Sequence, residues 1–287
     1  MRARLAQRAC FDRLGTSGIQ MIENKPSVAC AIRAALLTAA PFAKVRATRD
    51  VARAWRRGEL RFAFDCTMPD RPARPARPEL LAPNAMPKRG RGQSLRGRIA
   101  LLHAIAHIEF VAIDLALDIA GRFGGEMDRA FVGDWLAVAA DEAMHFALLA
   151  RRLGALGSAY GDLPAHDGLW ESAEATRHDI AARLAIVPMV LEARGLDVTP
   201  AMIERMRFAG DEASARILER IFSDEIRHVR CGTTWFGKVC ERAGSDPAAT
   251  WQALVEMHFR GGLKPPFNDS ARQAAGLPRE FYAGIAL

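Results

Sequence analysis

An Asp-Glu-x-x-His motif occurs twice in this sequence, each time inside an apolar stretch. The first copy, "DEAMHF", contains Glu142 and His145, and the second, "DEIRHV", contains Glu225 and His228. Residues three apart share one side of a helix, so each Glu and His pair faces the same way as its apolar neighbours. Ionised groups buried without partners cost several kcal/mol. The chain must therefore fold so that something compensates these side chains.

Two further glutamates repeat the pattern. Glu109 lies among apolar residues 33 positions before Glu142, and Glu192 lies among apolar residues 33 positions before Glu225. Each half of this region therefore predicts a helix with one buried glutamate, a turn, and a helix with Glu-x-x-His. Two such hairpins facing each other would bring four carboxylates and two imidazoles to one point.

The periodicity of apolar residues predicts an all-α fold. No segment shows sustained period-two alternation, so no sheet is expected. Ser94 is the expected N-cap of the first long helix. The segment "LDVTPAMIERMRFAG" is expected to form a turn and a short helix before the last long helix. Four long helices are predicted to form a four-helix bundle, at about 94–122, 127–154, 172–195 and 211–243.

The rest of the chain is predicted to decorate this bundle. An Arg-rich opening without the apolar core of a secretory signal indicates an N-terminal extension that lacks regular structure, with Met21 as an alternative translation start. Two short helices and a proline- and arginine-rich strap should follow, and a helix near 247–260 should precede the C-terminal tail. The expected divisions are 1–27, 28–93, 94–243 for the four-helix bundle, and 244–287.

Composition is typical of a soluble globular protein. The 287 residues are 50% hydrophobic and 25% charged, and no apolar run approaches the ~18 residues of a membrane-spanning helix. Five cysteines without a C-x-x-C motif indicate neither a disulfide framework nor a zinc ribbon. A reducing cytoplasm is the expected location.

Positive charge is concentrated in one segment, residues 71–98, called the strap below. The net charge of the whole chain is +7, and the strap alone accounts for this excess. Charge by itself favours a solvated or interdomain strap over a nucleic-acid site, and RNA binding stays as an alternative. The basic residues are Arg71, Arg74, Arg77, Lys88, Arg89, Arg91, Arg96 and Arg98, against Glu79 alone.

Two divalent metal ions would compensate the buried acids. Four carboxylates without cations would repel one another and take up protons, whereas metals would neutralise them and use both imidazoles. One Glu from each of two helices and Glu-x-x-His from each of two others is the ligand set of di-iron and di-manganese carboxylate bundles. Oxygen and nitrogen ligands without thiolate suit iron or manganese. The predicted ligands are Glu109, Glu142, His145, Glu192, Glu225 and His228.

Polar residues beside these ligands are predicted to support them. Asp141 and Asp224 each precede a liganding glutamate and could accept the far N–H of a ligand histidine. His107 and Asp114 form a second stripe on the first long helix and are expected in hydrogen bonds outside the ligands. Cys231 is expected to be a small core thiol. The alternative interpretation is that all these groups are core polar residues joined by salt bridges between helices.

Several strings of the sequence resemble a known family. The segments "HAIAHIEF", "DEAMHF", "LEARGLDVTP" and "DEIRHV", with "RPARPELL", "YGDLPAHDGLW" and "KPPFN", resemble bacterial ferritin-like proteins grouped as a domain of unknown function, over about 28–285. This resemblance implies a ferritin-like bundle and a dinuclear site but no established reaction. The twin motif is also similar to that of bacterial multicomponent monooxygenases and, more distantly, of the tRNA hydroxylase.

These observations favour an oxygen-dependent oxidase or hydroxylase with two iron ions. Its partners would be O₂ or peroxide, a small organic substrate and a reductase. Alternatives are iron oxidation, manganese-dependent peroxide breakdown, or a binding protein whose metals are structural and whose strap contacts RNA or an acidic partner. Pro188, four residues before Glu192, should bend the third helix, either for packing or to make room for substrate.

Overall fold

The structure is a computed structural model that describes residues 25–87, 94–259 and 261–286. Within these ranges it contains helices and isolated bridges but no strand, which confirms the predicted all-α bundle. The predicted extension over 1–27 lies almost wholly outside the described residues. The helices are α2 (Val28–Leu36), α3 (Pro41–Arg56), α4 (Leu95–Phe123), α5 (Arg129–Ala155), α6 (Gly168–Ala175), α7 (Ile180–Ile186), α8 (Ala193–Phe208), α9 (Glu212–Ala243), α10 (Pro247–His258), α11 (Asp269–Ala274) and α12 (Arg279–Tyr282), with a 3₁₀ turn η1 (Pro83–Ala85) and a π-helical turn η2 (Val187–Glu192).

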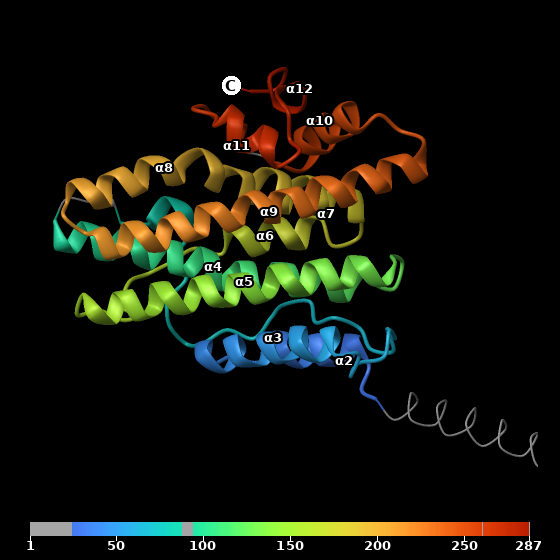
Figure 1. The fold of residues 1–287 in the computed structure, drawn as a ribbon, viewed down its shortest axis with the longest axis horizontal. Helices are drawn as coiled ribbons and strands as arrows, with labels where there is room; N and C mark the ends of the chain where they lie inside the picture. The colour runs from blue at the N-terminus through green and yellow to red at the C-terminus, as the bar shows by residue number, and fades with distance from the viewer. Residues whose placement is uncertain (1–24, 88–93, 260, 287) are drawn as a thin grey trace, which may run out of the picture.

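The helices are arranged in layers. Figure 1 shows the α2–α3 hairpin in blue, then the green α4–α5 pair, then α8 with α9, and the red C-terminal helices on the far side. Helix α4 packs on α5 and α8 packs on α9, while α5 and α9 join the two pairs. The core of the molecule therefore lies between α4, α5, α9 and the rod formed by α7, η2 and α8.

Side-chain caps set where the long helices begin. The Ser94 hydroxyl accepts a hydrogen bond from the Gly97 amide at 3.1 Å, as predicted for the start of α4. The Asp128 carboxylate caps α5 in the same way, accepting from the Phe131 amide at 2.9 Å. Each cap satisfies a backbone donor that the helix leaves free in its first turn.

The third long helix differs from its predicted bounds of 172–195. Helix α6 ends at Ala175, and a new helix starts after Asp179, whose carboxylate accepts from the Ala181 amide at 2.8 Å. This helix continues through η2 and α8 to Phe208, so the predicted turn in "LDVTPAMIERMRFAG" is wrong. Pro200 lies inside α8.

A contact from the C-terminal region explains why the helix passes through Pro200. Proline has no N–H to donate to the carbonyl of Leu196, four residues earlier. That carbonyl accepts a hydrogen bond from Nδ2 of Asn268 at 3.1 Å instead. The buried Arg272 guanidinium pairs with Asp197 at 2.8 and 2.7 Å and fixes the same segment on α8.

The α2–α3 hairpin is fastened to the bundle by a buried lysine. Lys44 is fully buried, and its ammonium group pairs with Asp114 of α4 and donates to the carbonyls of Leu36 (3.2 Å) and Ala73 (3.1 Å). Arg74 of the strap lies 2.6 Å from the other oxygen of Asp114. Because an isolated buried charge is costly, these pairings are required for the hairpin and strap to cover α4.

Other strap cations also find partners within the molecule. Arg71 pairs with Asp167 and lies 3.4 Å from Glu174, and Arg98 lies 3.3 Å from Asp211. These contacts support the interpretation of the strap as structural. Within the described residues no ion pair is seen for Arg77 or Arg96, and the basic residues at 88, 89 and 91 lie outside those ranges.

Helix α4 is long and apolar enough, by length and composition, to cross a membrane. The sequence contains no unbroken apolar run of that length, because the histidines and acids of α4 interrupt its apolar residues. Most of the apolar window is buried inside the molecule, which fits the core helix of a soluble protein.

We expect the Asn268 side chain to contribute less to stability when Pro200 is replaced. Asn268→Ser keeps a hydroxyl to cap α11 but leaves the Leu196 carbonyl without its donor, which should cost about 1–3 kcal/mol of unfolding free energy. In a Pro200→Ala background the backbone amide gained at that position can supply the donor, so the same substitution should cost less. Chemical denaturation of the wild-type protein, the two single variants and the double variant measures the coupling between the two substitutions. Equal costs in both backgrounds would contradict it.

Candidate metal centre

The six predicted ligands, called the Glu/His cluster below, lie in the centre of the bundle. Four separate segments supply them: α4, α5, the last residue of η2, and α9. Both histidines are almost fully buried, as are three of the glutamates, and the carboxylate oxygens of the fourth, Glu192, are shielded from solvent. The members are Glu109, Glu142, His145, Glu192, Glu225 and His228.

Both imidazoles turn their Nδ1 atoms toward the carboxylates. His145 Nδ1 lies 3.2 Å from Glu109 Oε2 and 3.4 Å from Glu142 Oε2. His228 Nδ1 lies 2.8 Å from Glu142 Oε1 and 3.6 Å from Glu225 Oε1. Glu142 thus contacts both histidines, whose ring centroids are 5.6 Å apart. These nitrogens point at the place where the carboxylates converge.

The far nitrogen of each histidine contacts the aspartate of the opposite motif. His145 Nε2 is 3.0 Å from Asp224 Oδ2, and His228 Nε2 is 3.4 Å from Asp141 Oδ2. Helices α5 and α9 run in opposite directions (Figure 1), so the Asp of one motif lies beside the His of the other. A proton on Nε2 held by an aspartate leaves the lone pair of Nδ1 free for a metal.

Arginines on α9 hold both aspartates from outside. Nη2 of Arg227 is 2.5 Å from Asp224 and 3.3 Å from Asp141, and Nε of Arg220 is 2.6 Å from Asp224. Burial would raise the pKa of Asp224, but the hydrogen bonds from His145, Arg220 and Arg227 outweigh it and hold that pKa well below its usual range. Asp224 therefore stays ionised beside His145.

Burial and mutual repulsion act on the glutamates. They raise the pKa of Glu109 and Glu192 well above the usual range, and they raise that of Glu225. For His145, burial works in the opposite direction, but Asp224, Glu109 and Glu142 overcome it and raise the pKa to about 12. Four carboxylates at this depth therefore need positive charge nearby, and protons supply it where no metal does.

Several acceptors in the cluster have no donor. Among the described residues, nothing donates a hydrogen bond to either carboxylate oxygen of Glu192 or to Oε2 of Glu225, although all three atoms are buried. Buried acceptors without partners are rare and costly. Oxygen and nitrogen donors in this arrangement suit a hard or borderline divalent cation. The chemistry of the donor set thus fits a metal.

Four residues of the cluster meet the geometric requirement of a metal site most closely. One ligand atom from each of Glu109, Glu142, His145 and Glu225 can be chosen so that all four lie within 4.8 Å of one another. This buried Glu/His group could hold a metal ion. Glu192 and His228 lie beside it, each close enough to Glu142 for their charges to interact.

His107 and Asp114 belong to other networks. Nδ1 of His107 lies 3.0 Å from the Tyr160 hydroxyl and its Nε2 lies 3.2 Å from the His166 carbonyl, while Asp114 pairs with Lys44 and the strap. None of the hydrogen bonds or ion pairs described for these two side chains reaches the Glu/His cluster. Their hydrogen bonds and ion pairs therefore lie outside the ligand set, because His107 faces the 160–166 loop and Asp114 faces the hairpin and the strap.

The π-helical turn positions Glu192. The sequence predicts a kink at Pro188, and the structure has a π-helical segment, η2, that begins beside Pro188 and ends at Glu192. Gly232 of α9 makes room for it, since a Cβ added there would lie 2.5 Å from the ring of Pro188. Segments of π-helix are rare and occur frequently at functional sites.

A cavity of about 150 Å³ adjoins the carboxylate side of the cluster. All four glutamates of the cluster line it, and its other walls are mostly apolar. Ile108, which is 44% exposed, lies at the edge toward solvent. The apolar walls include Ile105, Ile108, Leu191, Met202, Leu218 and Ile221.

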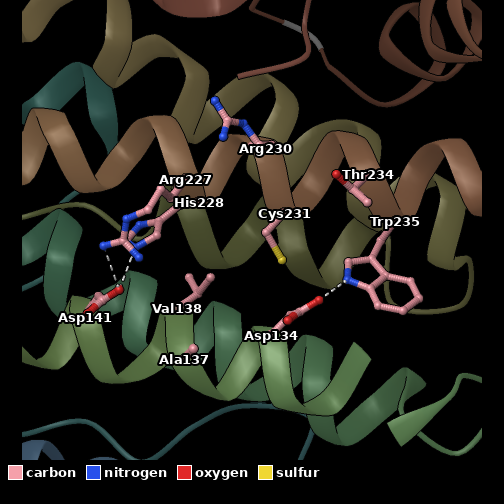
Figure 2. Close-up of a pocket in the computed structure, with 10 residues that line it drawn as sticks. All are labelled: Asp134, Ala137, Val138, Asp141, Arg227, His228, Arg230, Cys231, Thr234 and Trp235. Atoms are coloured by element: carbon pink, nitrogen blue, oxygen red, sulfur yellow. Dashed lines mark hydrogen bonds and ion pairs between the residues drawn. The ribbon is translucent and has the colours of Figure 1, made fainter. Parts of the chain in front are cut away.

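A groove of about 260 Å³ lies between α5 and α9 on the histidine side (Figure 2). Asp141 and His228 line one part of it, and a hydrogen bond from Trp235 Nε1 to Asp134 at 2.9 Å crosses it further along. Cys231, expected to be a core thiol, points into this groove and is only partly buried. Burial still raises the pKa of its thiol, which favours the protonated form.

Comparison with known proteins places the chain in a family. A family model described as "Protein of unknown function (DUF455)" matches residues 37–283. The chain belongs to the DUF455 family. The predicted resemblance to a family grouped by unknown function is thereby confirmed. The family description names no activity, so the function of this DUF455 protein must be inferred from its site.

A relative of this DUF455 protein occurs in Haemophilus influenzae (strain ATCC 51907 / DSM 11121 / KW20 / Rd), where it is described as "Uncharacterized protein". It is 45% identical over 209 residues, which cover 71% of this chain and 72% of the relative. No solved structure matches the chain.

We expect Gly232→Ala to disturb the centre and Gly237→Ala to leave it intact. The methyl group that Gly232→Ala adds would overlap the rigid ring of Pro188, and such overpacking should cost about 1–3 kcal/mol of unfolding free energy. Gly237, on the same helix, has no atom within 4 Å of an added Cβ, so alanine there should stabilise by up to about 1 kcal/mol. Thermal unfolding and metal content measure both effects. A neutral Gly232→Ala would show that η2 does not depend on this contact.

Proposed function

We propose that this DUF455 protein is a ferritin-like dinuclear metal protein that uses O₂ to oxidise or hydroxylate a small organic substrate. The observation that carries the proposal is the pairing of a buried Glu/His cluster, which has carboxylates without donors, with an apolar cavity against those carboxylates. A metal site buried only for stability has no need of such a cavity. The proposed metal is iron, with manganese as the alternative.

Each half of the cluster supplies one set of ligands. Glu109 with the Glu142 and His145 pair would form one set, and Glu192 with the Glu225 and His228 pair the other. This is the ligand set of ferritin-like di-iron and di-manganese proteins, which supports the ferritin-like assignment. Two iron ions held by carboxylates and imidazoles supply, when bound, the electrons and open coordination positions that reduction of O₂ requires.

The aspartates and Arg227 act as positioning residues in this proposal. Asp224 and Asp141 hold a proton on Nε2 of His145 and His228, so that Nδ1 of each ring stays available to a metal. Arg227 contacts both aspartates and keeps them ionised. The chain thus fixes the tautomers of both ligands with groups that do not themselves touch the metal positions.

The cavity indicates the kind of substrate. Side chains such as Leu218 and Ile221 exclude water from the carboxylate side of the cluster and offer only dispersion contacts to a guest. A volume of about 150 Å³ is comparable to that of an apolar protein cavity that accepts a benzene-sized molecule. The proposed substrate is therefore small and apolar at the end that enters the cavity. A reductase would supply electrons from outside.

We expect close to two iron ions per chain and a defined reaction with O₂. The anaerobic ferrous protein should consume one O₂ for every two irons and develop ferric absorption, because both metals must be oxidised together. His145→Ala and His228→Ala should each lower iron content, measured by elemental analysis. Full occupancy in the double variant would refute the ligand assignment. A ferrous protein inert to O₂, with manganese bound in cells, would favour peroxide breakdown or a structural site.

The substrate cavity can be tested at Gly195. A Cβ at Gly195 would meet only Glu225 Cγ, at 4.0 Å, so Gly195→Ala fits, whereas the side chain of Gly195→Leu must extend into the cavity. We expect Gly195→Leu to weaken the binding of benzene, followed by ligand-observed NMR, by about tenfold or more, since it removes the space the guest needs. Gly195→Ala should change it little. Equal binding by the two variants would place the guest elsewhere.

A further inference from the structure

Two cysteines and an aspartate meet at a surface site far in sequence from the Glu/His cluster. Cys30 lies in the first turn of α2, and Asp65 and Cys66 lie in the segment that follows α3. One ligand atom from each can be chosen so that all three lie within 4.8 Å of one another. Cys30 and Asp65 are exposed, and Cys66 is partly buried, so a solute can reach the group.

Backbone hydrogen bonds hold the two segments together. The amide of Val28 donates to the Arg61 carbonyl at 2.9 Å, and the amide of Ala29 donates to the Ala63 carbonyl at 3.3 Å. The Ser27 hydroxyl caps α2 by accepting from the Cys30 amide at 3.1 Å. The main chain therefore fixes the separation of the three side chains before any ligand binds, which lowers the cost of binding one.

The two oxygens of Asp65 face different partners. Oδ1 lies 3.5 Å from Cys30 Sγ, while Oδ2 lies 3.2 Å from the Arg61 guanidinium. Arg61 therefore orients the carboxylate so that one oxygen faces the thiols. Two sulfur atoms and one carboxylate oxygen are therefore presented close together, and a thiophilic cation could bind all three.

We propose that Cys30, Asp65 and Cys66 form a second metal site, for a thiophilic divalent cation of the zinc class. Two sulfur ligands and one carboxylate suit such a cation better than the oxygen-rich set of the Glu/His cluster does. Bond lengths of about 2.3 Å to sulfur and 2.0 Å to oxygen place tetrahedral ligands about 3.5 Å apart. The distance from Cys30 Sγ to Asp65 Oδ1 is 3.5 Å. Solvent would occupy the fourth position.

A metal here would clasp α2 to the segment that covers the end of α4. Phe64 packs on Gly124, where an added Cβ would lie 2.5 Å from its ring, and Met68 packs on Gly121 with an equally close approach. Asp65 and Cys66 lie between these two contacts in sequence. The proposed site therefore joins the start of the first described helix to the C-terminal end of α4.

Cobalt(II) is a suitable probe, because a cobalt–thiolate bond gives strong near-ultraviolet absorption that carboxylate and imidazole ligands do not give. We expect one equivalent of cobalt per chain to produce this band in the reduced full-length protein, and zinc to abolish it. Cys30→Ser and Cys66→Ser should each remove the band. Asp65→Asn should weaken cobalt binding by about tenfold or more, since an amide is a poorer ligand than a carboxylate.

Matched controls separate this site from the rest of the molecule. Cys231→Ser, which replaces another partly buried cysteine, should keep the band, and so should His145→Ala, because neither touches the proposed ligands. A band that survives in the Cys30→Ser and Cys66→Ser double variant would overturn the proposal. So would a mass two hydrogens lower, mapped to a Cys30–Cys66 disulfide, in protein isolated under reducing conditions without bound metal.

Discussion

The central physical constraint in this protein is the burial of four carboxylates at one point of an apolar bundle. Two imidazoles lie among them, and each imidazole is held from behind by an aspartate that belongs to the opposite helix. Without this crossed arrangement, the repulsion between Glu109, Glu142 and their counterparts would favour separation of the two helix pairs. The polar centre therefore determines how α5 and α9 face each other, and the apolar core fills the space around that choice.

The outer elements of the molecule pair further polar groups that the core helices bury. A rod with a π-helical turn in its middle leaves backbone carbonyls exposed to an apolar environment, and distant segments satisfy them. Trp251 of α10 donates to the Ala185 carbonyl at 3.2 Å, one turn before Pro188. The hairpin and strap do the equivalent on α4, where Lys44 and Arg74 neutralise a buried aspartate. Helices outside the four-helix core thus pair polar groups that the core cannot pair itself.

Local patterns in the sequence predicted a large part of this arrangement. The equal spacing from Glu109 to Glu142 and from Glu192 to Glu225 predicted that four helices bring these residues together, and the structure places them on those helices. Spacing predicts these positions because the side of a helix that a residue faces follows from its place in the local sequence. The predicted extent of the third helix was wrong, because the helix continues through Pro200. There the side chain of Asn268, which is far away in sequence, satisfies the Leu196 carbonyl. The partners of His107 and Asp114 could not be predicted for the same reason, because they come from a loop and a hairpin. The periodicity of apolar residues does not reveal how such segments pack.

Dependence of α8 on the C-terminal region has a consequence for the order of events during synthesis. Glu109, Glu142 and His145 leave the ribosome early, and their two helices can pair as soon as both are complete. The rod that carries Glu192 is different, because its Leu196 and Ala185 carbonyls wait for Asn268 and Trp251. The ribosome must therefore add many tens of residues after Glu109, Glu142 and His145 before the rod that carries Glu192 can be fixed. We therefore expect the early glutamates to stay accessible to water during that interval, and the fully enclosed centre to form late.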